Sequence, residues 1–510
     1  MRKALVVLEV LCFATVIFGT IDSGEKPALN EVFRVSDKDE GVFGKAQPEN
    51  NDFAAFLKED SEVSKKHELQ KKIDLVTQKI EVNPRSDGWY ATRSYLYLED
   101  RNYKSAVEDI NKAIEINAKN ENYYVLKGEA LLLGGNASDE AIAELKKAVE
   151  INPRCLIAYG VQAMAYDLRD DHDGAISCYN KILELEPNDA YSYRERGFAY
   201  RWKNDYEKAL LDLNKSIELN PKDYRAWFYR GRVYGLMRNS VNELADYSES
   251  IKLDPDFYWS RNNRGTLYDE SKKYSQAVED YNKAIEIDPN EAMAYGNRGN
   301  TFRHMGEYAR AIDDYNKLIA LKPEESDNYD SVAYVYEDME DTDKAIEYFS
   351  KSIALKPDDA KKYYNRGRAL VVKKDNDKGM EDLKKAIALD PNYSDAYSEM
   401  GVAYDNKGVY RKAIECYDKS ITLNKNAAIA YYNRGRSFSL LKEYDKAIED
   451  RNKCIEIDPA YVDAYIGRGW TYYLKNDYQK AIQDFSKAIE LNPKIVLAYS
   501  NRGIIIVQRN

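Results

Sequence analysis

A proline recurs every 34 residues along most of this chain. Eight prolines follow one another at that interval, and two more resume the same register after Lys425: Pro153, Pro187, Pro221, Pro255, Pro289, Pro323, Pro357 and Pro391, then Pro459 and Pro493. Self-similarity at a fixed period is typical of repeat architectures, in which each unit contacts only its neighbours. Alignment of the chain on itself predicts twelve full units and a truncated thirteenth, which begin at Asp87, Glu121, Leu156, Ala190, Tyr224, Tyr258, Ala292, Ser326, Ala360, Ser394, Ala428, Val462 and Val496.

The size and charge of the chain agree with a soluble array. A compact protein of 510 residues would need about three domains, whereas an array gains length without enlarging any single core. The formal net charge is -11, while a surface that binds nucleic acid needs a basic stripe that attracts phosphates. We therefore expect one elongated domain with no nucleic-acid partner.

Each unit has the pattern of a helical hairpin. In the sixth unit, apolar and aromatic residues recur at helical spacing over residues 259–270 and again over 274–287, with a polar stretch between them. Gly265 lies inside the first helix, where glycine costs about 1 kcal/mol relative to alanine, so we expect a close helix contact opposite Ala277. Pro289 ends the second helix because proline lacks the amide donor and clashes with the preceding turn.

The spacing of these residues resembles that of the tetratricopeptide repeat. The seventh unit shows the pattern, which consists of Tyr295, Gly299, Phe302, Ala311, Tyr315 and Pro323. The resemblance covers residues 87–495 in twelve copies, and residues 496–510 form the first helix of a truncated thirteenth. It implies an all-α, right-handed superhelical solenoid, in which the first helices line a concave groove that binds peptides or protein partners.

One position departs from the family pattern. Arginine replaces the usual large apolar residue just before the small one in nine units: Arg93, Arg196, Arg230, Arg264, Arg298, Arg366, Arg434, Arg468 and Arg502. An aspartate follows sixteen residues after each of the first eight: Asp109, Asp212, Asp246, Asp280, Asp314, Asp382, Asp450 and Asp484. The three full units without a basic residue at the first position have no acid at the second, and Lys127 in the second unit has Glu144 as its counterpart. Because a guanidinium can bind a carboxylate with two hydrogen bonds, we predict structural ion pairs between the two helices of each unit, rather than an anion-binding site.

Two sets of side chains are candidates for contacts with a ligand in the groove. In this family the residue two before the small one tends to point into the groove, and five units have asparagine there: Asn263, Asn297, Asn365, Asn433 and Asn501. An asparagine amide offers donors and an acceptor that match the peptide bonds of an extended ligand. The pattern partly resembles the asparagine ladder of O-linked N-acetylglucosamine transferases, with interruptions at Ser331, Glu399 and Gly467. The alternative is that a polar residue stands there only because it tolerates solvent. The aromatic candidates are Trp202, Trp259 and Trp470.

The sequence shows no pattern of a catalytic or metal site. The three histidines, His67, His172 and His304, lie far apart in the chain, and no metal-ligand spacing or nucleophile constellation surrounds them. No phosphate-binding glycine motif follows a strand pattern. We therefore predict no catalytic residue, no cofactor and no metal.

The two ends of the chain differ from the repeats. Residues 1–19 have the basic, apolar and small-residue order of a secretory signal peptide, although Glu9 within the apolar run leaves an uncleaved signal anchor as the alternative. Residues 20–52 have the composition of a flexible linker, and residues 53–86 are predicted to form N-terminal capping helices with an apolar stripe of Leu69, Ile73, Val76 and Ile80. At the other end, Ile504, Ile505, Ile506 and Val507 are followed by no second helix, which predicts self-association or a partner contact there.

These features leave three functional hypotheses open. The first is an exported protein-interaction scaffold, periplasmic or secreted. The second is a membrane-anchored adaptor of the same binding type that faces outward and serves envelope or surface complex assembly. The third is a carbohydrate-binding or glycosylation-associated protein, which would use aromatic groove residues. Fold alone does not choose among them.

Overall fold

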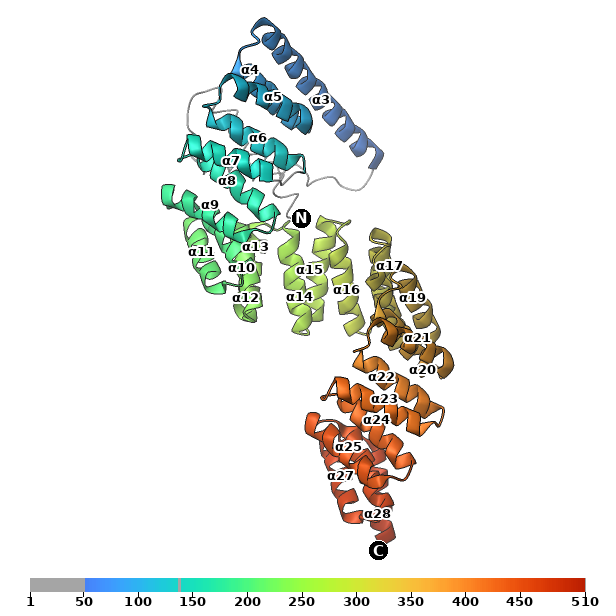
Figure 1. Ribbon diagram of the computed structural model, residues 1–510. Helices are drawn as coiled ribbons and strands as arrows, with labels where there is room; N and C mark the ends of the chain where they lie inside the picture. Colours follow the sequence, from blue (N-terminus) through green and yellow to red (C-terminus); the bar gives the residue numbers. More distant parts are fainter. Residues whose placement is uncertain (1–50, 136–138, 510) are drawn as a thin grey trace. The chain divides into compact units, whose positions relative to one another are not determined.

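The computed structural model describes residues 51–135 and 139–509 (Figure 1). Within these ranges the regular structure is helical and no strand occurs, which confirms the predicted all-α class. The predicted signal segment and nearly all of the predicted linker lie outside the described residues.

Twelve helical hairpins follow one another from residue 87, and each first helix begins at the first residue of a predicted unit. The first helices are α4 (Asp87–Glu99), α6 (Glu121–Leu133), α8 (Leu156–Leu168), α10 (Ala190–Trp202), α12 (Tyr224–Leu236), α14 (Tyr258–Glu270), α16 (Ala292–His304), α18 (Ser326–Asp338), α20 (Ala360–Val372), α22 (Ser394–Asn406), α24 (Ala428–Leu440) and α26 (Val462–Leu474). The second helices are α5 (Tyr103–Ile116), α7 (Asp139–Ile151), α9 (His172–Leu185), α11 (Tyr206–Leu219), α13 (Ser240–Leu253), α15 (Tyr274–Ile287), α17 (Tyr308–Leu321), α19 (Thr342–Leu355), α21 (Asn376–Leu389), α23 (Tyr410–Leu423), α25 (Tyr444–Ile457) and α27 (Tyr478–Leu491). The thirteenth unit has its first helix, α28 (Val496–Arg509).

The array divides into two compact units, one ending at Arg264 and the other beginning at Gly265. Apart from contacts with α14, which contains the division, each second helix packs on the first helix of its own hairpin and on that of the next. Consecutive first helices also contact one another, as α4, α6 and α8 do in the first unit and α20, α22, α24, α26 and α28 do in the second (Figure 1). Neighbouring second helices make no contact of that extent in the described part of the chain. The first helices therefore lie on the inner side of each curved stack.

The small position of each hairpin explains how its two helices approach closely. At nine of the ten glycines there, an added Cβ atom would lie 2.5–3.1 Å from the nearest atom of the second helix, so a larger residue would require the neighbouring atoms to shift: Gly128, Gly197, Gly231, Gly265, Gly299, Gly367, Gly401, Gly435 and Gly469. The exception is Gly503 on α28, where an added Cβ would meet nothing within 4 Å. The close contact predicted at Gly265 is thus present, and its partner is Tyr281.

The turn between the two helices of every hairpin has one residue in the left-handed region. These twelve residues have φ between 57° and 84°: Arg101, Gly135, Asp170, Asn204, Arg238, Lys272, Gly306, Glu340, Lys374, Gly408, Lys442 and Asn476. An L-residue in this conformation costs roughly 1–2 kcal/mol. The second helix begins two residues later in eleven hairpins, and four residues after Gly135 in the remaining one. Side chains such as Asp205 cap it by accepting a hydrogen bond from the backbone of Lys208.

The arginine–aspartate pairs tie these hairpins together. Seven of the eight predicted pairs have two hydrogen bonds, from Nε and Nη2 of the arginine to the two carboxylate oxygens, with lengths of 2.6–2.9 Å: Arg93–Asp109, Arg196–Asp212, Arg230–Asp246, Arg298–Asp314, Arg366–Asp382, Arg434–Asp450 and Arg468–Asp484. Lys127 bonds Glu144 at 3.0 Å. Arg264 and Asp280 fall on either side of the division between the two units, and their pairing stays a prediction.

Each of these arginines also reaches back to the preceding helix, which is α3 (Asn51–Val82) for Arg93 and a second helix for the others. Nη1 donates to a residue sixteen positions earlier, such as Asn180 for Arg196 and Asn282 for Arg298, at 2.7 and 2.6 Å. The same contact joins Arg502 on α28 to Ser486 on α27 at 3.1 Å. The arginine therefore holds three helices at once, which the pairing pattern alone did not predict.

The N-terminal cap is one continuous helix, α3 (Asn51–Val82), rather than the several capping helices predicted for residues 53–86. The reason is that residues 51–82 contain no proline or glycine to interrupt a helix. Ile73, Val76 and Ile80 of the predicted apolar stripe are buried in one cluster with Leu96 of α4, and Leu69 packs against that cluster. The stripe thus covers the first hairpin of the array.

Candidate functional site

Hydrogen bonds between consecutive first helices define one face of the array. Asn365 on α20 donates to the hydroxyl of Tyr334 on α18 at 2.8 Å, and Arg368 donates to Glu337 at 2.6 Å. Arg303 on α16 donates to Asp338 on α18. These side chains stand at the sixth, ninth, twelfth and thirteenth residues of their units, and the surface made by those four positions is named the inner face.

In the compact unit that begins at Gly265, the charges of the inner face are largely paired with one another. Besides the two arginine pairs, His304 on α16 lies 3.1 Å from Asp269 on α14. Beside this face, Lys362 is fully buried between Asp327 and Asp330, with Nζ 2.5 Å from an oxygen of Asp330. Burying charges is tolerable only when they are paired in this way.

Glu399 on α22 is an inner-face acid whose pKa is displaced toward neutral pH. Burial raises the pKa of this carboxyl to about 7, and the positive charge of Arg368 acts in the opposite direction. The side chain is half-buried at the sixth position of its unit. Its protonation state therefore changes near neutral pH.

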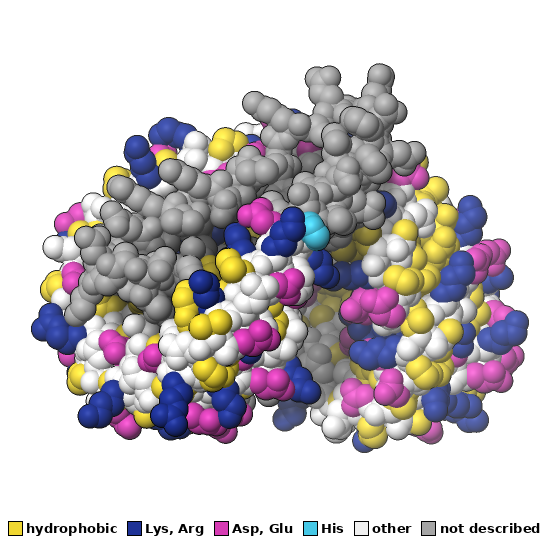
Figure 2. Space-filling model, turned by 90° about the horizontal axis from the view of Figure 1, so that it is seen from above, with side chains coloured by type: hydrophobic (Ala, Val, Ile, Leu, Met, Phe, Trp, Pro, Cys, Tyr) yellow, Lys and Arg dark blue, Asp and Glu magenta, His cyan; other side chains and the backbone are white. Residues whose placement is uncertain are grey.

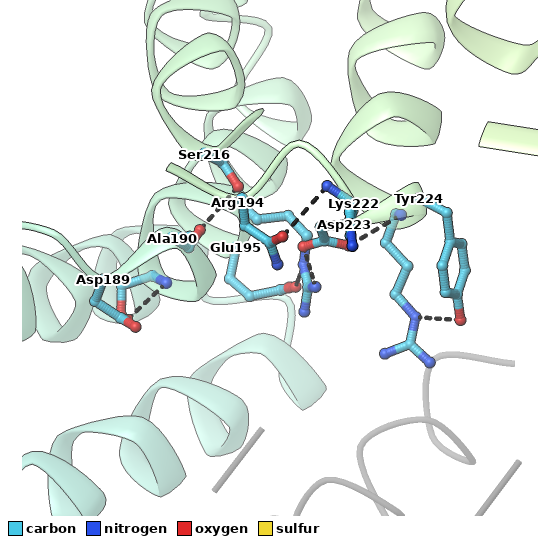
Figure 3. Close-up of polar contacts among 11 residues, drawn as sticks. Asp189, Ala190, Arg194, Glu195, Ser216, Lys222, Asp223 and Tyr224 are labelled. Atoms are coloured by element: carbon cyan, nitrogen blue, oxygen red, sulfur yellow. Dashed lines mark hydrogen bonds and ion pairs between the residues drawn. The ribbon is translucent and has the colours of Figure 1, made fainter. Parts of the chain in front are cut away.

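In the compact unit that ends at Arg264, buried charges also connect one hairpin to the next. Arg194 on α10 donates from Nε to Glu195 and from Nη1 to Asp223, both at 2.7 Å (Figure 3). The two carboxylates raise the pKa of the Arg194 guanidinium although burial alone would lower it. Asp223 also caps α12 by accepting from the backbone nitrogen of Arg225 at 3.0 Å. Asp223 therefore fixes both the start of α12 and the side chain of Arg194.

The predicted asparagine ladder is only partly available to a ligand. Asn365 is buried, with 3% of its surface exposed, and its amide is used by Tyr334. Its assignment as a groove contact is therefore wrong, because a tyrosine of the preceding unit occupies the amide. Asn263, Asn297, Asn433 and Asn501 are half-buried.

Two of the three candidate tryptophans are exposed on the inner face. Trp202 on α10 is 48% exposed and stacks on His172, with ring centroids 5.9 Å apart. Trp470 on α26 is 43% exposed and stacks on Tyr473 at 5.0 Å. Trp259 is half-buried. The two exposed rings are held in place by neighbouring rings, so they offer rigid apolar surfaces.

Arg451, which reaches the inner-face position Gly467 from a second helix, was not predicted from the sequence. It stands on α25, where the other eleven units have an apolar or aromatic residue: Ile110, Leu145, Tyr179, Leu213, Tyr247, Tyr281, Tyr315, Phe349, Leu383, Tyr417 and Phe485. Its guanidinium lies beneath Gly467, and an added Cβ at that glycine would be 2.7 Å from Nε of Arg451. The interruption of the asparagine ladder at Gly467 therefore has a steric cause, and the exceptional charge at residue 451 was the available signal.

The described residues hold no arrangement typical of a metal site or a membrane span. Among residues 51–135 and 139–509, no three His, Cys, Asp or Glu side chains come together as a metal ion would require. No helix in those ranges has the length and apolar character needed to cross a bilayer. On the face seen in Figure 2, basic and acidic side chains are interspersed rather than gathered into a basic stripe.

Comparison with known proteins agrees with this architecture. Family models described as tetratricopeptide repeat match residues 190–223, 258–291, 292–325, 428–461 and 462–495, and also 90–120, 156–189, 326–359 and 394–426. A further model described as TPR repeat matches residues 367–408.

Individual proteins match this chain either over a short stretch or at low sequence identity. The protein SGT1 homolog of Oryza sativa subsp. japonica is 35% identical over 79 residues, which are 16% of this chain and 19% of that protein. The chain thus spans about a fifth of the length of this curated relative. Among solved structures, the APC/C hetero-tetramer Cut9-Hcn1 has a chain that is 16% identical, with 82% of this chain and 96% of that chain covered and a TM-score of 0.42. Yeast Tom70 is 14% identical, with 82% and 95% covered and a TM-score of 0.45.

The family matches span more than half of the chain, and the nine matches to the models described as tetratricopeptide repeat each fall within one hairpin unit. The chain belongs to the tetratricopeptide repeat family.

Proposed function

We propose that this protein is a non-catalytic scaffold that binds an extended segment of a partner protein along the inner face. Tetratricopeptide arrays are protein-interaction scaffolds, and the inner face is the surface of this array that fits the role. The observation that carries the proposal is that each compact unit has an exposed, rigidly held tryptophan ring on a first helix, Trp202 on α10 and Trp470 on α26. Exposed aromatic surfaces of this kind are enriched where proteins bind one another.

The pairing of charges on the inner face indicates what kind of contact a partner would make. Arg303 and Arg368 are already engaged by Asp338 and Glu337, so a ligand gains little from them. The half-buried amide of Asn433 and the tryptophan rings remain as the groups for hydrogen bonding and apolar contact. Such a surface suits a peptide bound through its backbone and a few apolar anchors.

Affinity capture with matched variants tests this proposal. The protein would be immobilised and exposed to extract from its source cells, with Trp202→Ala/Trp470→Ala as the inner-face variant. Leu211→Ala/Val241→Ala is the control, because these exposed apolar residues lie on second helices, with 70% and 78% of their surface exposed. We expect partners that bind the wild type and the control and are lost from the inner-face variant. Equal capture by both variants would contradict the proposal.

We further infer export from residues 1–19, with the signal either cleaved or kept as an outward-facing membrane anchor. The observation that supports export is the order of basic, apolar and small residues at the start of the chain. Sequencing the mature N-terminus from fractionated cells decides between these forms. A mature protein that retains Met1 in the cytosolic fraction would overturn both.

The C-terminal helix supports a second contact surface. On α28, Ile504 and Ile506 are 44% and 46% exposed, and the space beside Gly503 is open, unlike that beside the nine equivalent glycines. Ile505, one of the residues predicted to take part in self-association, is instead buried against the cluster around Phe485. The side chain of Val507 lies outside the described ones.

We propose that Ile504 and Ile506 mediate self-association. Sedimentation at micromolar concentration should show oligomers that Ile506→Glu abolishes, and a monomeric wild type would contradict the contact.

A further inference from the structure

Glu399 places a carboxylate at an inner-face position where nearly all units have a neutral side chain. Of the thirteen residues at the sixth position, eleven are neutral and the other two are Glu195 and Glu399. Glu195 accepts a hydrogen bond from Nε of Arg194 at 2.7 Å, so its charge is compensated within the array. The charge of Glu399 has no such partner and needs a separate explanation.

The cation that acts on Glu399 is already engaged elsewhere. This cation is Arg368 on α20, whose Nη2 donates to Glu337 on α18 at 2.6 Å. Glu399 itself accepts no hydrogen bond and forms no ion pair within the described part of the chain. Its carboxylate is thus partly withdrawn from water without a cation beside it, which is unfavourable for the charged form.

Tyrosine rings of two neighbouring helices lie near this carboxylate. Burial raises the pKa of Tyr364 on α20 to about 12, and the negative charge of Glu399 acts in the same direction. Burial and Asp405 raise the pKa of Tyr417 on α23, and Glu399 contributes to that rise as well. The ring of Tyr364 packs on that of Tyr393, with centroids 5.0 Å apart. Because aromatic faces attract cations, a carboxylate beside such rings suits an ammonium or guanidinium group.

A ligand can reach Glu399 from the inner face. Glu399 and Tyr364 are both half-buried, so each side chain keeps contact with solvent. The carboxylate oxygens of Glu399 are not enclosed, in contrast to those of Glu129, an acid that is fully buried. Asp395 precedes Glu399 by one helical turn on α22 and is exposed, so it adds negative potential at the same place.

We propose that Glu399, with the ring of Tyr364 beside it, forms a subsite that binds the ammonium or guanidinium group of a lysine or arginine side chain in the partner segment. This inference rests on the inner-face binding proposed above and adds one charged contact to it. The cation of the ligand supplies to Glu399 the compensation that Glu195 receives from Arg194.

A basic side chain fits this subsite better than a metal ion does. Calcium and magnesium ions bind about six oxygen ligands. Across residues 51–135 and 139–509, no three His, Cys, Asp or Glu side chains come together in that way. A single organic cation needs only one carboxylate and an apolar or aromatic surface for its stem.

The test uses butylammonium chloride, an analogue of the lysine side chain, and does not require the partner. The carboxyl carbon of Glu399 is followed by carbon-13 NMR in glutamate-labelled protein and is assigned by its loss in Glu399→Gln. Without the probe, this carboxyl should titrate with a pKa of about 7. Saturating butylammonium should lower that pKa by about one pH unit, because a nearby cation favours the charged form. Sodium chloride at the same ionic strength should produce no saturable change.

Thermal unfolding at pH 8 supplies a matched control. Butylammonium should raise the melting temperature of the wild type and of Glu381→Gln, which changes an exposed acid on α21. It should not raise that of Glu399→Gln. Where Glu399→Gln fails to fold, Glu399→Ser replaces it, since Ser331 occupies the equivalent position of another unit.

Three results would overturn the proposal. The first is a Glu399 titration that butylammonium leaves unchanged. The second is an equal change with sodium chloride, which would show general screening of charge. The third is an equal change with butanol, which would show that the alkyl chain binds without need of the cation. Failure of inner-face binding itself would appear separately, as unchanged partner capture by the tryptophan variant.

Discussion

Arg298 donates two hydrogen bonds to the carboxylate of Asp314, from Nε at 2.8 Å and from Nη2 at 2.6 Å. Its third nitrogen, Nη1, donates to Asn282 on the preceding second helix at 2.6 Å. The same geometry recurs through both units, so the arginine series belongs to the framework of the array. The arginine–aspartate pairs therefore hold the helices in place.

The first prediction concerns this pair. Replacement of one partner, Arg298→Met or Asp314→Leu, leaves the other charge half-buried and should cost about 2–4 kcal/mol of unfolding free energy. The double variant should be less destabilised than the sum of the two, because neither charge is then left alone. Chemical denaturation of the four proteins gives the coupling energy. The exposed pair Arg310–Glu307 is the control and should couple by less than about 1 kcal/mol. Additive losses at Arg298 and Asp314 would show that the contact carries no energy.

The second prediction uses the glycines of the small position. Gly401→Ala places a Cβ 2.5 Å from the ring of Tyr417 and should destabilise the array by about 1–3 kcal/mol through overpacking. Gly503→Ala meets nothing within 4 Å and should instead raise stability by up to about 1 kcal/mol through helix propensity. Thermal unfolding of the two variants compares them directly. A loss of stability in Gly503→Ala would mean that α28 is covered in solution.

The third prediction concerns the left-handed turn residues. Gly408 has φ of 74° and open space around it, so Gly408→Ala should cost about 1 kcal/mol through the backbone alone. Lys374 has φ of 68° at the equivalent turn, so Lys374→Gly should have the opposite sign and gain up to about 1 kcal/mol. Denaturant midpoints measure both changes. The same sign for the two variants would be inconsistent with strain at this turn.

The fourth prediction is a pH dependence that arises from Glu399. Burial raises its pKa from an ordinary 4.5 to about 7, so between these values the folded state holds a proton that the unfolded state releases. Stability contributed by the protonated carboxyl is therefore present at low pH and lost as the pH rises through 7. The loss amounts to at most about 3 kcal/mol. Glu399→Gln should remove this decline when melting temperatures are compared between about pH 5 and pH 8. An unchanged pH profile in Glu399→Gln would assign the dependence to another group.

Much of the fold could be predicted from the sequence because the repeats of the chain can be aligned with one another. The starting residues of all thirteen first helices were predictable, since the turn chemistry recurs in the same register. The charge pattern in different units also pointed to contacts such as Arg298 with Asp314. These predictions rest on local periodicity and on geometry that is nearly the same in every hairpin.

The inner face was harder to predict because its contacts join different units and have no fixed period. Asn365 was predicted to face a ligand, yet a tyrosine of the preceding unit binds its amide. Gly467 looked like a simple gap in the ladder, whereas Arg451 from the next layer of helices fills it. In both cases a side chain from one helix fills space beside another helix. Tertiary packing decides such contacts, and the residue pattern of a single repeat does not predict them.

The central claim, that partners bind along the inner face, is tested most directly by site-specific photo-crosslinking in the source cells. A photoreactive amino acid would replace Trp202 or Trp470 on the inner face, and Leu211 or Val241 on second helices as exposed controls. Crosslinked adducts would be resolved by mass and identified by mass spectrometry. The account predicts discrete partner adducts from residues 202 and 470 and none from 211 and 241. Adducts that form only from the second-helix positions would contradict it.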